Sequence, residues 1–270
     1  MTEQTGPRQV QSVSRACEIL AYLKENGACH LTRIAEDLDQ TPGTVHTYLS
    51  TLRTAGFVQK EQQKYNLGLA FVPYSKRIKG QTPLYKAGKN ETDRLAHKYD
   101  AVSHLTKEFD GQIVTLHEIS GEEAVGKKLH TEKQERPWFR IHCTAAGKAI
   151  LAHLPEERVN SILTQRDLPA YTSHTITDPE ELLEDLQAIR DRGYSVNDQE
   201  SMYGNRGFAA PILLDSGTLV GAISISGPAN SWKDELFTDE LPEAVMRSAN
   251  NIEINLSTES RSRTGGQFTG

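Results

Sequence analysis

Residues 41–67 read TPGTVHTYLSTLRTAGFVQKEQQKYNL, and this stretch decides the fold of the N-terminal part of the chain. Pro42 suits the first turn of a helix, where an amide donor is not needed, and Thr41 before it can cap that helix. Apolar residues then recur at helical spacing until Gly56 ends the pattern: Val45, Tyr48, Leu49 and Leu52. The stretch therefore predicts a helix from Pro42 to about residue 55.

Two further helices are expected upstream of this stretch, and a β-hairpin follows the helix. The spacing of apolar residues predicts a helix over 12–26, which Gly27 stops. A shorter helix over 32–38 follows, with Thr32 as its expected N-cap. After the helix at Pro42, two β-type runs lie on either side of a polar turn: 57–60 and 64–67. Three helices followed by a hairpin are typical of a winged helix-turn-helix.

The remainder of the chain mixes helices and strands. Runs such as IVTLHEI and LVGAISI alternate in the manner of an antiparallel sheet with one covered face. Helices are expected over 69–79, 84–99, 145–153, 155–165, 179–192 and 239–256, and strands over 102–109, 112–119, 123–129, 194–199, 207–214 and 219–226. The sequence thus predicts an α+β protein made of a winged helix-turn-helix at 8–68, linker helices at 69–99, a second domain at 100–256 and a disordered polar tail at 257–270.

Size and charge suit a two-domain cytoplasmic protein. The 270 residues exceed one typical domain, and no apolar run reaches the roughly 18–20 residues of a membrane span. Three unevenly spaced cysteines do not form a disulfide framework, and the N-terminus lacks the apolar core of a secretion signal. The net charge of −6 is uneven: residues 1–80 hold 10 Lys+Arg against 7 Asp+Glu, a net +3, which leaves 20 against 29, a net −9. A mildly basic first domain permits DNA binding without diagnosing it.

The third helix offers a polar face that fits the major groove of DNA, which admits one helix and presents base edges to its side chains. Lys60 and Lys64 flank the hairpin turn as a wing over the DNA backbone, and Arg8 and Arg15 are placed to reach an adjacent groove. A lone helix of this kind is more often a solvated face, and winged helices also serve as interaction modules. The ordered set of elements nevertheless favours DNA. The expected DNA-binding residues are Arg8, Arg15, Thr32, Gly43, Thr44, His46, Thr47, Ser50, Arg53, Lys60 and Lys64.

Several stretches of the sequence resemble the IclR family of transcription regulators. They are SVSRACEIL, LTRIAEDL, TPGTVHTYLSTLRTAGFV and KYNLGL in the first domain, and IHCTAAGKAILAHLP, TDPEELLEDLQAIRDRGYSVND and FAAPILLDSGTLVGAISISGP in the second. The resemblance spans about residues 8–256. It implies a winged helix, a linker helix and a GAF-like α/β effector domain, assembled as a dimer or a dimer of dimers on a palindromic operator. One departure is Thr47, which stands where the family usually has arginine in a T-V-H-R segment, so a strong phosphate or guanine partner is missing.

Three elements of the second domain can converge on a small polar or anionic ligand. Thr144 is expected to cap the helix 145–153, whose small first residues leave amides accessible to a carboxylate. Asn197, on a short strand, can complete the ring of polar contacts. The period of the strand 219–226 places Val220, Ala222, Ser224 and Ser226 on one face. The two hydroxyls on that face suggest a lined pocket, although ordinary sheet polarity explains a serine pair equally well.

The IclR resemblance implies effector contacts at the same places, at Ala145, Ala146, Asn197, Gly207, Ser224 and Ser226. Family members often carry an acidic residue at the Asn197 position and a Cys or other residue at Gly207, so this site is expected to be larger and less negative. Leu129, Trp138 and Ile141 are candidates for an apolar lid, but Trp138 is more often simple core or interface. The sequence therefore predicts a small effector, of carboxylate type, whose identity stays open.

Catalytic, metal and cofactor chemistry is not expected. His142 and the other histidines lack zinc spacing, and the AAGKA segment at 145–149 lacks the glycine and Ser/Thr of a phosphate loop. The acidic residues of 178–185 fit the charged start of a helix. The alternative hypothesis is an enzyme acting on small carboxylates, with the winged helix as an accessory interaction domain. It needs a base or nucleophile with a perturbed pKa near Ser224 or Asn197, which the sequence does not supply.

Overall fold

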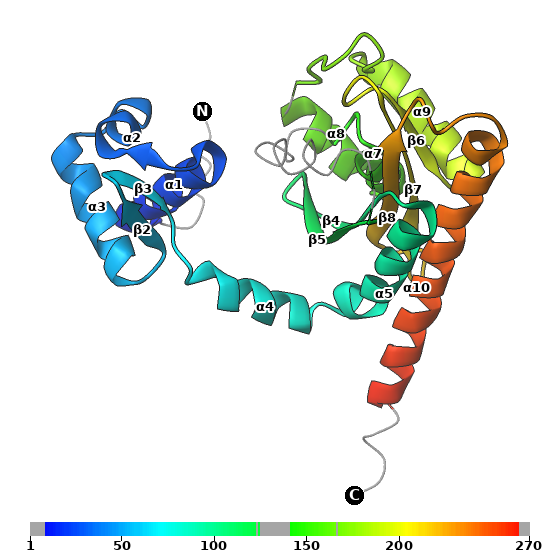
Figure 1. The fold of residues 1–270 in the computed structure, drawn as a ribbon, viewed down its shortest axis with the longest axis horizontal. Coiled ribbons are helices and arrows are strands. Elements are labelled where there is room, and N and C mark those ends of the chain that lie inside the picture. The colour runs from blue at the N-terminus through cyan, green and yellow to red at the C-terminus, as the bar shows by residue number, and fades with distance from the viewer. Residues whose placement is uncertain (1–8, 123, 125–140, 166, 265–270) are drawn as a thin grey trace, which may run out of the picture. The chain divides into compact units, whose positions relative to one another are not determined.

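The computed structural model describes residues 9–122, 124, 141–165 and 167–264, and the side chains of the last helix up to residue 258 (Figure 1). The chain divides into two compact units, Met1–Ile78 and Lys79–Gly270, and each has its own hydrophobic core. No helix in the described part of the chain is both long enough and apolar enough to cross a membrane.

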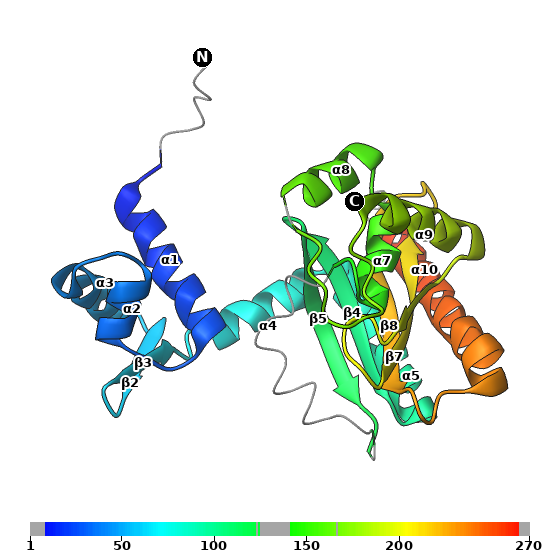
Figure 2. The same cartoon turned by 90° about the horizontal axis from the view of Figure 1, so that it is seen from above.

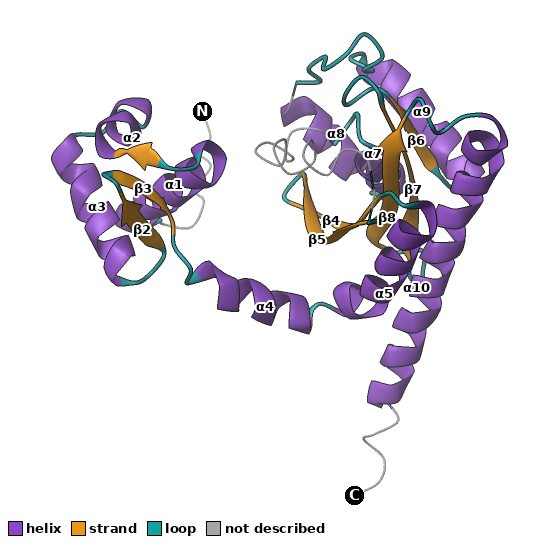
Figure 3. Cartoon of the chain, in the orientation of Figure 1, coloured by secondary structure: helices purple, strands orange, loops and turns teal. Residues whose placement is uncertain are grey.

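The first unit is a three-helix cluster closed by a small antiparallel sheet (Figure 3). Its elements are α1 (Gln11–Asn26), β1 (Cys29–His30), α2 (Leu31–Asp37), α3 (Pro42–Thr54), β2 (Val58–Glu61) and β3 (Lys64–Leu67). The predicted helices and the hairpin are confirmed. The strand β1 was not predicted, because two residues are too few to show an alternating pattern. It pairs with β3, which makes a three-stranded sheet in the order β1-β3-β2.

Local capping explains most of the boundaries in this unit. The Thr41 hydroxyl accepts a hydrogen bond from the backbone N of Thr44 at 3.2 Å, and Pro42 opens α3 as predicted. The expectation that Thr32 caps α2 is wrong. The helix begins at Leu31, because His30 is still extended where it pairs with Lys64 and the chain enters the helix directly from the strand.

The second unit is a five-stranded antiparallel sheet with helices on both faces, which confirms the α+β class. The strands are β4 (Val102–Phe109), β5 (Gln112–Ser120), β6 (Ser195–Asp198), β7 (Asn205–Leu213) and β8 (Leu219–Pro228), in the order β5-β4-β8-β7-β6. The helices are α4 (Phe71–Gln81), which spans the division between the units, α5 (Pro83–Tyr99), α7 (Ala145–His153), α8 (Glu156–Gln165), α9 (Pro179–Arg192), the π-helical turn η2 (Leu236–Glu240) and α10 (Leu241–Thr264). The strand expected over 123–129 lies almost wholly outside the described residues.

The last helix is longer than the sequence predicts. A polar tail was expected from residue 257, yet α10 continues to Thr264. The hydroxyl groups at this point fit a helix because they donate to carbonyls one turn back: Ser257 Oγ to Glu253 O at 3.0 Å, and Thr258 Oγ1 to Ile254 O at 2.9 Å. Polarity alone was therefore a poor guide to where the helix ends.

The sheet divides the core of this unit into two layers (Figures 1 and 2). Ile223 and Ile225 of β8 pack on the side of α5 and α10, and Ala222 packs on the side of α7, α8 and α9. The predicted alternation fails at the start of β8. Leu213 pairs with Leu219 and Ile212 with Gly221, so Val220 is the extra residue of a bulge and joins the α5 and α10 side.

The start of α7 is held tightly against the sheet. A Cβ atom on Gly147 would lie 2.1 Å from the carbonyl O of Ile141, so the preceding turn of chain passes where a side chain would stand. Ser195 Oγ on β6 donates to the Ala145 carbonyl at 2.6 Å. Thr144 Oγ1 accepts from the Gly147 backbone N at 3.1 Å, which confirms the predicted cap.

A buried ion cluster fixes the turn after β6 against α7. The Lys148 side chain is 3% exposed and donates to Asp185 Oδ2 of α9 at 2.8 Å and to Glu200 Oε1 at 2.7 Å. Burial raises the pKa of Glu200 above its ordinary value, while the charge of Lys148 acts in the opposite direction. The other carboxylate oxygen of Glu200, Oε2, has no hydrogen-bond partner among the described residues.

The replacement Gly147→Ala is expected to destabilise the second unit by about 2 kcal/mol or more, because the new methyl group meets a backbone carbonyl that cannot move aside easily. Gly80→Ala is the matched control, since a Cβ atom at this helical glycine meets nothing within 4 Å. Urea unfolding followed by circular dichroism measures both variants. Equal stability of Gly147→Ala and wild type would contradict the close contact at Ile141.

The variant Glu200→Gln is expected to gain stability relative to wild type as the pH rises. Because the folded pKa of Glu200 is raised, the folded chain binds this proton more tightly than the unfolded chain does. The contribution of this carboxyl to stability is therefore present below the ordinary glutamate pKa of about 4.3 and is lost as the pH rises through the folded pKa. Unfolding free energies at closely spaced pH values, with the exposed Glu184→Gln as control, test this. A pH-independent difference between variant and wild type would argue against it.

Candidate functional site

The helix α3 has a buried apolar side and an exposed polar side. Val45 and Leu49 are fully buried, and Leu52 is 8% exposed. The predicted contact residues lie on the other side: His46, Thr47 and Arg53 are exposed, as is Gly43, while Thr44 and Ser50 are partly exposed. The geometric requirement for docking in a major groove, a hidden stripe and an open polar face, is therefore met by this helix.

The threonine hydroxyls on this helix are already engaged as donors. Thr47 Oγ1 donates to Gly43 O, and Thr51 Oγ1 donates to Thr47 O, each at 3.0 Å. Thr44 Oγ1 shares a hydrogen bond of 2.9 Å with Thr41 Oγ1. A hydroxyl that donates within the helix still has oxygen lone pairs, so Thr47 and Thr51 present acceptors outward. Cationic and imidazole side chains are therefore better candidates than these threonines for donating to phosphate.

Cationic side chains suited to that role lie around the hairpin and on α1. Lys60 and Lys64 are exposed, and the Lys60 ammonium lies over the Tyr65 ring, 5.3 Å from its centre, in a cation–π contact. Arg15 on α1 is exposed as well. Arg8 lies outside the described residues.

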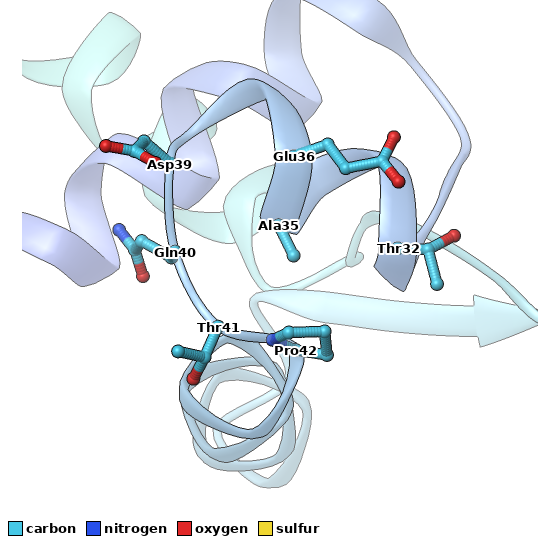
Figure 4. Close-up of a pocket in the computed structure, with 7 residues that line it drawn as sticks. All are labelled: Thr32, Ala35, Glu36, Asp39, Gln40, Thr41 and Pro42. Atoms are coloured by element: carbon cyan, nitrogen blue, oxygen red, sulfur yellow. The ribbon is translucent and has the colours of Figure 1, made fainter.

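A surface hollow lies between α2 and the start of α3 (Figure 4). Thr32 and Thr41 are at its edge, together with two carboxylates, Glu36 and Asp39. Thr32 and Glu36 are neighbours on α2, and their side chains lie next to each other in Figure 4. Because negative charge repels phosphate, the hollow itself is unsuited to the DNA backbone, and a contact from Thr32 is possible only away from these carboxylates.

In the second unit the predicted effector residues meet on the α7 face of the sheet. Strand pairing sets Asn197 opposite Gly207, and Gly207 opposite Ser226. A Cβ atom on Gly207 would lie 3.7 Å from the Cβ atoms of both Ala145 and Ser226, so the first residue of α7 stands directly over this row. Two residues along the strands, Ala209 is opposite Ser224.

The two serines differ in their surroundings. The Ser226 Oγ atom is buried and has no hydrogen-bond partner among the described residues. Ser224 is buried as a residue, with 6% of its surface exposed. An unsatisfied buried hydroxyl costs free energy, and it is a group that a bound ligand can satisfy. Thr144 is part of the same corner, but its hydroxyl accepts from the Gly147 amide, so that first-turn amide is not open to a ligand as was expected. Ala145 and Ala146 are buried at the same helix start.

The Asn197 side chain forms hydrogen bonds with the turn that follows its own strand. Its Oδ1 accepts from the backbone N atoms of Glu200 and Ser201, and its Nδ2 donates to Ser201 Oγ at 2.8 Å. These bonds shape the turn that carries Glu200 to Lys148. Of the predicted lid residues, Ile141 is buried in the α7 layer, and Leu129 and Trp138 lie outside the described residues.

Sequence reasoning missed other residues near this face. The ion cluster of Lys148, Glu200 and Asp185 was not foreseen, because it joins residues 37 and 52 positions apart. His104 is one of the histidines that were considered only as zinc ligands and rejected, and it pairs directly with Ser224 across β4 and β8. The signal that finds it is the register between two strands more than a hundred residues apart, which a single sequence does not provide.

The sequence analysis rejected several residues as metal ligands or catalytic groups, and two of them make contacts that organise the fold. In the described part of the chain no group of three or more His, Cys, Asp or Glu residues is arranged to hold a metal ion. His142 Nε2 lies 3.1 Å from Pro169 O, and burial lowers the pKa of His142. Asp178 caps α9 by accepting from the backbone N of Glu180 and Glu181, in agreement with the interpretation of the acidic run as a helix start.

Two family models match the chain. The model described as the IclR helix-turn-helix domain matches residues 12–62, and the model of the bacterial transcriptional regulator IclR C-terminal domain matches residues 78–254. A protein described as a probable HTH-type transcriptional regulator, ArcR of Halobacterium salinarum, is 38% identical over 253 residues, which are 93% of this chain and 96% of that protein. The transcriptional repressor IclR of Escherichia coli is 30% identical over 258 residues, 91% of this chain and 90% of that protein.

Solved structures share the fold. An IclR regulator from Alicyclobacillus acidocaldarius superposes with a TM-score of 0.78 at 24% identity, over 92% of this chain and 100% of that chain. An IclR homologue from Microbacterium hydrocarbonoxydans, complexed with 4-hydroxybenzoate, has a TM-score of 0.74 at 21% identity, over 92% of this chain and 99% of that chain. Because the family models and relatives are transcription regulators and not enzymes, the enzyme hypothesis is dropped. The chain belongs to the IclR family of transcription regulators, with a helix-turn-helix DNA-binding domain and an effector-binding C-terminal domain.

Proposed function

We propose that this regulator binds a palindromic operator as a homodimer or a dimer of dimers, and that a small carboxylate held on the α7 face of the sheet controls its DNA binding. The observation that carries the effector site is the meeting of Ala145, Gly207 and Ser226 around a buried hydroxyl that lacks a partner among the described residues. The solved homologue that is complexed with 4-hydroxybenzoate supports the choice of a carboxylate.

The proposed DNA contacts begin at the N-terminal half of α3. His46 and Thr47 are exposed there and face base edges if the helix lies in the major groove, while Lys60 and Lys64 on the hairpin bind phosphates. With Thr47 in place of an arginine, Arg53 and Lys60 supply the missing positive charge. Pairing of two chains repeats this contact on a second half-site, about one or two turns of DNA away.

The effector acts only through a difference in affinity. A ligand shifts the arrangement of two DNA-binding domains by as much as its binding differs between the two arrangements. The proposed carboxylate touches the start of α7, and α7 is tied to β6 by Ser195 and to α9 by Lys148. A change at the ligand is therefore passed first to these two elements.

Lys60→Ala and Lys64→Ala are expected to weaken binding to all DNA sequences and to reduce the slope of log K against log salt by about 0.9 for each phosphate that is no longer neutralised. Fluorescence anisotropy with the upstream promoter fragment, at several salt concentrations, measures the slope. Lys107→Ala, an exposed lysine on β4 of the second unit, is the control for total charge. An unchanged slope in both hairpin variants would remove the wing from the DNA-binding surface.

Ser226→Ala is expected to have opposite effects on the free protein and on the complex. Removing a buried hydroxyl without a partner raises the melting temperature of the free protein, whereas losing a hydrogen bond to a charged ligand weakens effector binding by about tenfold or more. A thermal-shift screen over aromatic, keto and sugar acids, followed by calorimetry, measures both. The exposed loop variant Ser216→Ala is the control. Full effector affinity in Ser226→Ala and in Ser224→Ala would place the pocket elsewhere.

A further inference from the structure

His104 lies on the proposed effector face of the sheet. The register of β4 with β8 sets His104 opposite Ser224, and Val102 opposite Ser226. Paired residues of an antiparallel sheet point to the same side, with Cβ atoms about 4.5–5.5 Å apart. The neighbouring Leu105 packs in the α5 and α10 layer. Because successive residues of a strand point to opposite faces, this places the His104 side chain on the α7 side. The imidazole is therefore an immediate neighbour of the Ser224 hydroxyl.

The imidazole is paired with a carboxylate on the same face. His104 Nε2 lies 3.2 Å from Glu118 Oε2, and the two side chains are 17% and 26% exposed. Glu118 is the strand partner of His104 on β5, so the pair is set by register and not by a flexible loop. This orients the imidazole ring next to Ser224.

The polar groups of the face therefore form two rows. One row holds Gly207 and Ser226 beneath Ala145, and the other holds Ser224, His104 and Glu118. Two residues along a strand separate the rows, a distance of about 6.6–6.8 Å. A ligand that reaches both rows needs two polar ends at roughly that separation.

We propose that the effector is a small carboxylic acid with a second, uncharged oxygen function, a hydroxyl or oxo group, and that His104, oriented by Glu118, binds this second oxygen. The carboxylate lies at the Ser226 row, beside the start of α7, as the proposed function requires. A second carboxylate is disfavoured at the other row, because Glu118 already places a negative charge there. His104 thus determines which acids the regulator distinguishes, and this inference rests on the proposed effector site.

The test uses the full chain and pairs of acids that differ in the second oxygen. The pairs are 4-hydroxybenzoate with benzoate, 5-oxohexanoate with hexanoate, and 5-hydroxypentanoate with pentanoate, because in these acids the second oxygen can stand far enough from the carboxylate to reach the other row. Calorimetry on the wild type is expected to show at least one oxygenated acid binding about tenfold tighter than its partner, the value of one hydrogen bond of about 1.4 kcal/mol. In His104→Ala this ratio is expected to fall to about twofold or less, while the affinity for the simple acid stays within about twofold of wild type.

Two further variants separate recognition from folding. Glu118→Gln is expected to reduce the same ratio only in part, because the imidazole remains but loses its charged partner. His97→Ala, which removes an exposed imidazole on α5, is the control and leaves the ratio unchanged. Where His104→Ala does not fold, His104→Asn replaces it, because asparagine keeps a polar side chain at a shorter reach. Retention of the full ratio in the folded His104 variant overturns the proposal.

Failure of this inference is distinguishable from failure of the proposed function. Equal weakening of both acids of a pair in His104→Ala overturns the role of His104 alone. The absence of any acid that binds the wild type overturns the proposed effector site, and this inference with it. A gel shift with the upstream promoter fragment tests DNA binding separately. If the protein retards the DNA and an acid changes this binding, but the His104 variant still discriminates between the two acids of a pair as the wild type does, the regulatory function stands and the role of His104 is wrong.

Discussion

The pairing of β8 with β7 on one side and β4 on the other is the constraint on which the second domain depends. It brings together three segments that are distant in sequence and gives them a common register. That register decides which side chains share a face. Ile223 and Ile225 go to the α5 and α10 layer, and Ser224 and Ser226 go to the α7 layer. A slip of one residue would exchange the two sets, burying hydroxyls in an aliphatic core, so the apolar layer protects the polar face.

Around this sheet, polar contacts are concentrated where α7 begins. Ser195 ties that end of the helix to β6, the Lys148 cluster ties it to α9 and to the turn after β6, and Thr144 caps it within the helix itself. Buried ion pairs of this kind add little net stability when compared with apolar packing, but removing one partner leaves an uncompensated charge. Their effect is to allow few arrangements of α7. A face of small residues next to such a fixed helix is a suitable place for a ligand whose recognition depends on tenths of an ångström.

Much of this fold follows from short-range pattern, and the candidate site only in part. The helix at Pro42, the cap at Thr144 and the bounds of α7 and α9 were predicted because each depends on neighbours within a few residues. The two-residue strand β1 and the bulge at Val220 were not, since each is decided by a partner strand. The end of α10 was missed because the polarity of its last residues was interpreted as a tail. The IclR resemblance supplied the effector positions. It did not indicate that the Asn197 side chain is hydrogen-bonded to the turn after β6, or that His104 is the strand partner of Ser224.

The donor bonds of the α3 threonines have a consequence for the kind of base edge this helix suits. Thr47 and Thr51 use their hydroxyl protons inside the helix, so each presents on the exposed side an oxygen acceptor flanked by a methyl group. In the major groove the exocyclic amino groups of adenine and cytosine offer protons, while guanine offers only acceptors along its edge. Under the docking proposed for α3, an operator step rich in amino groups is therefore a better match for these two threonines than guanine, with thymine methyls as apolar neighbours.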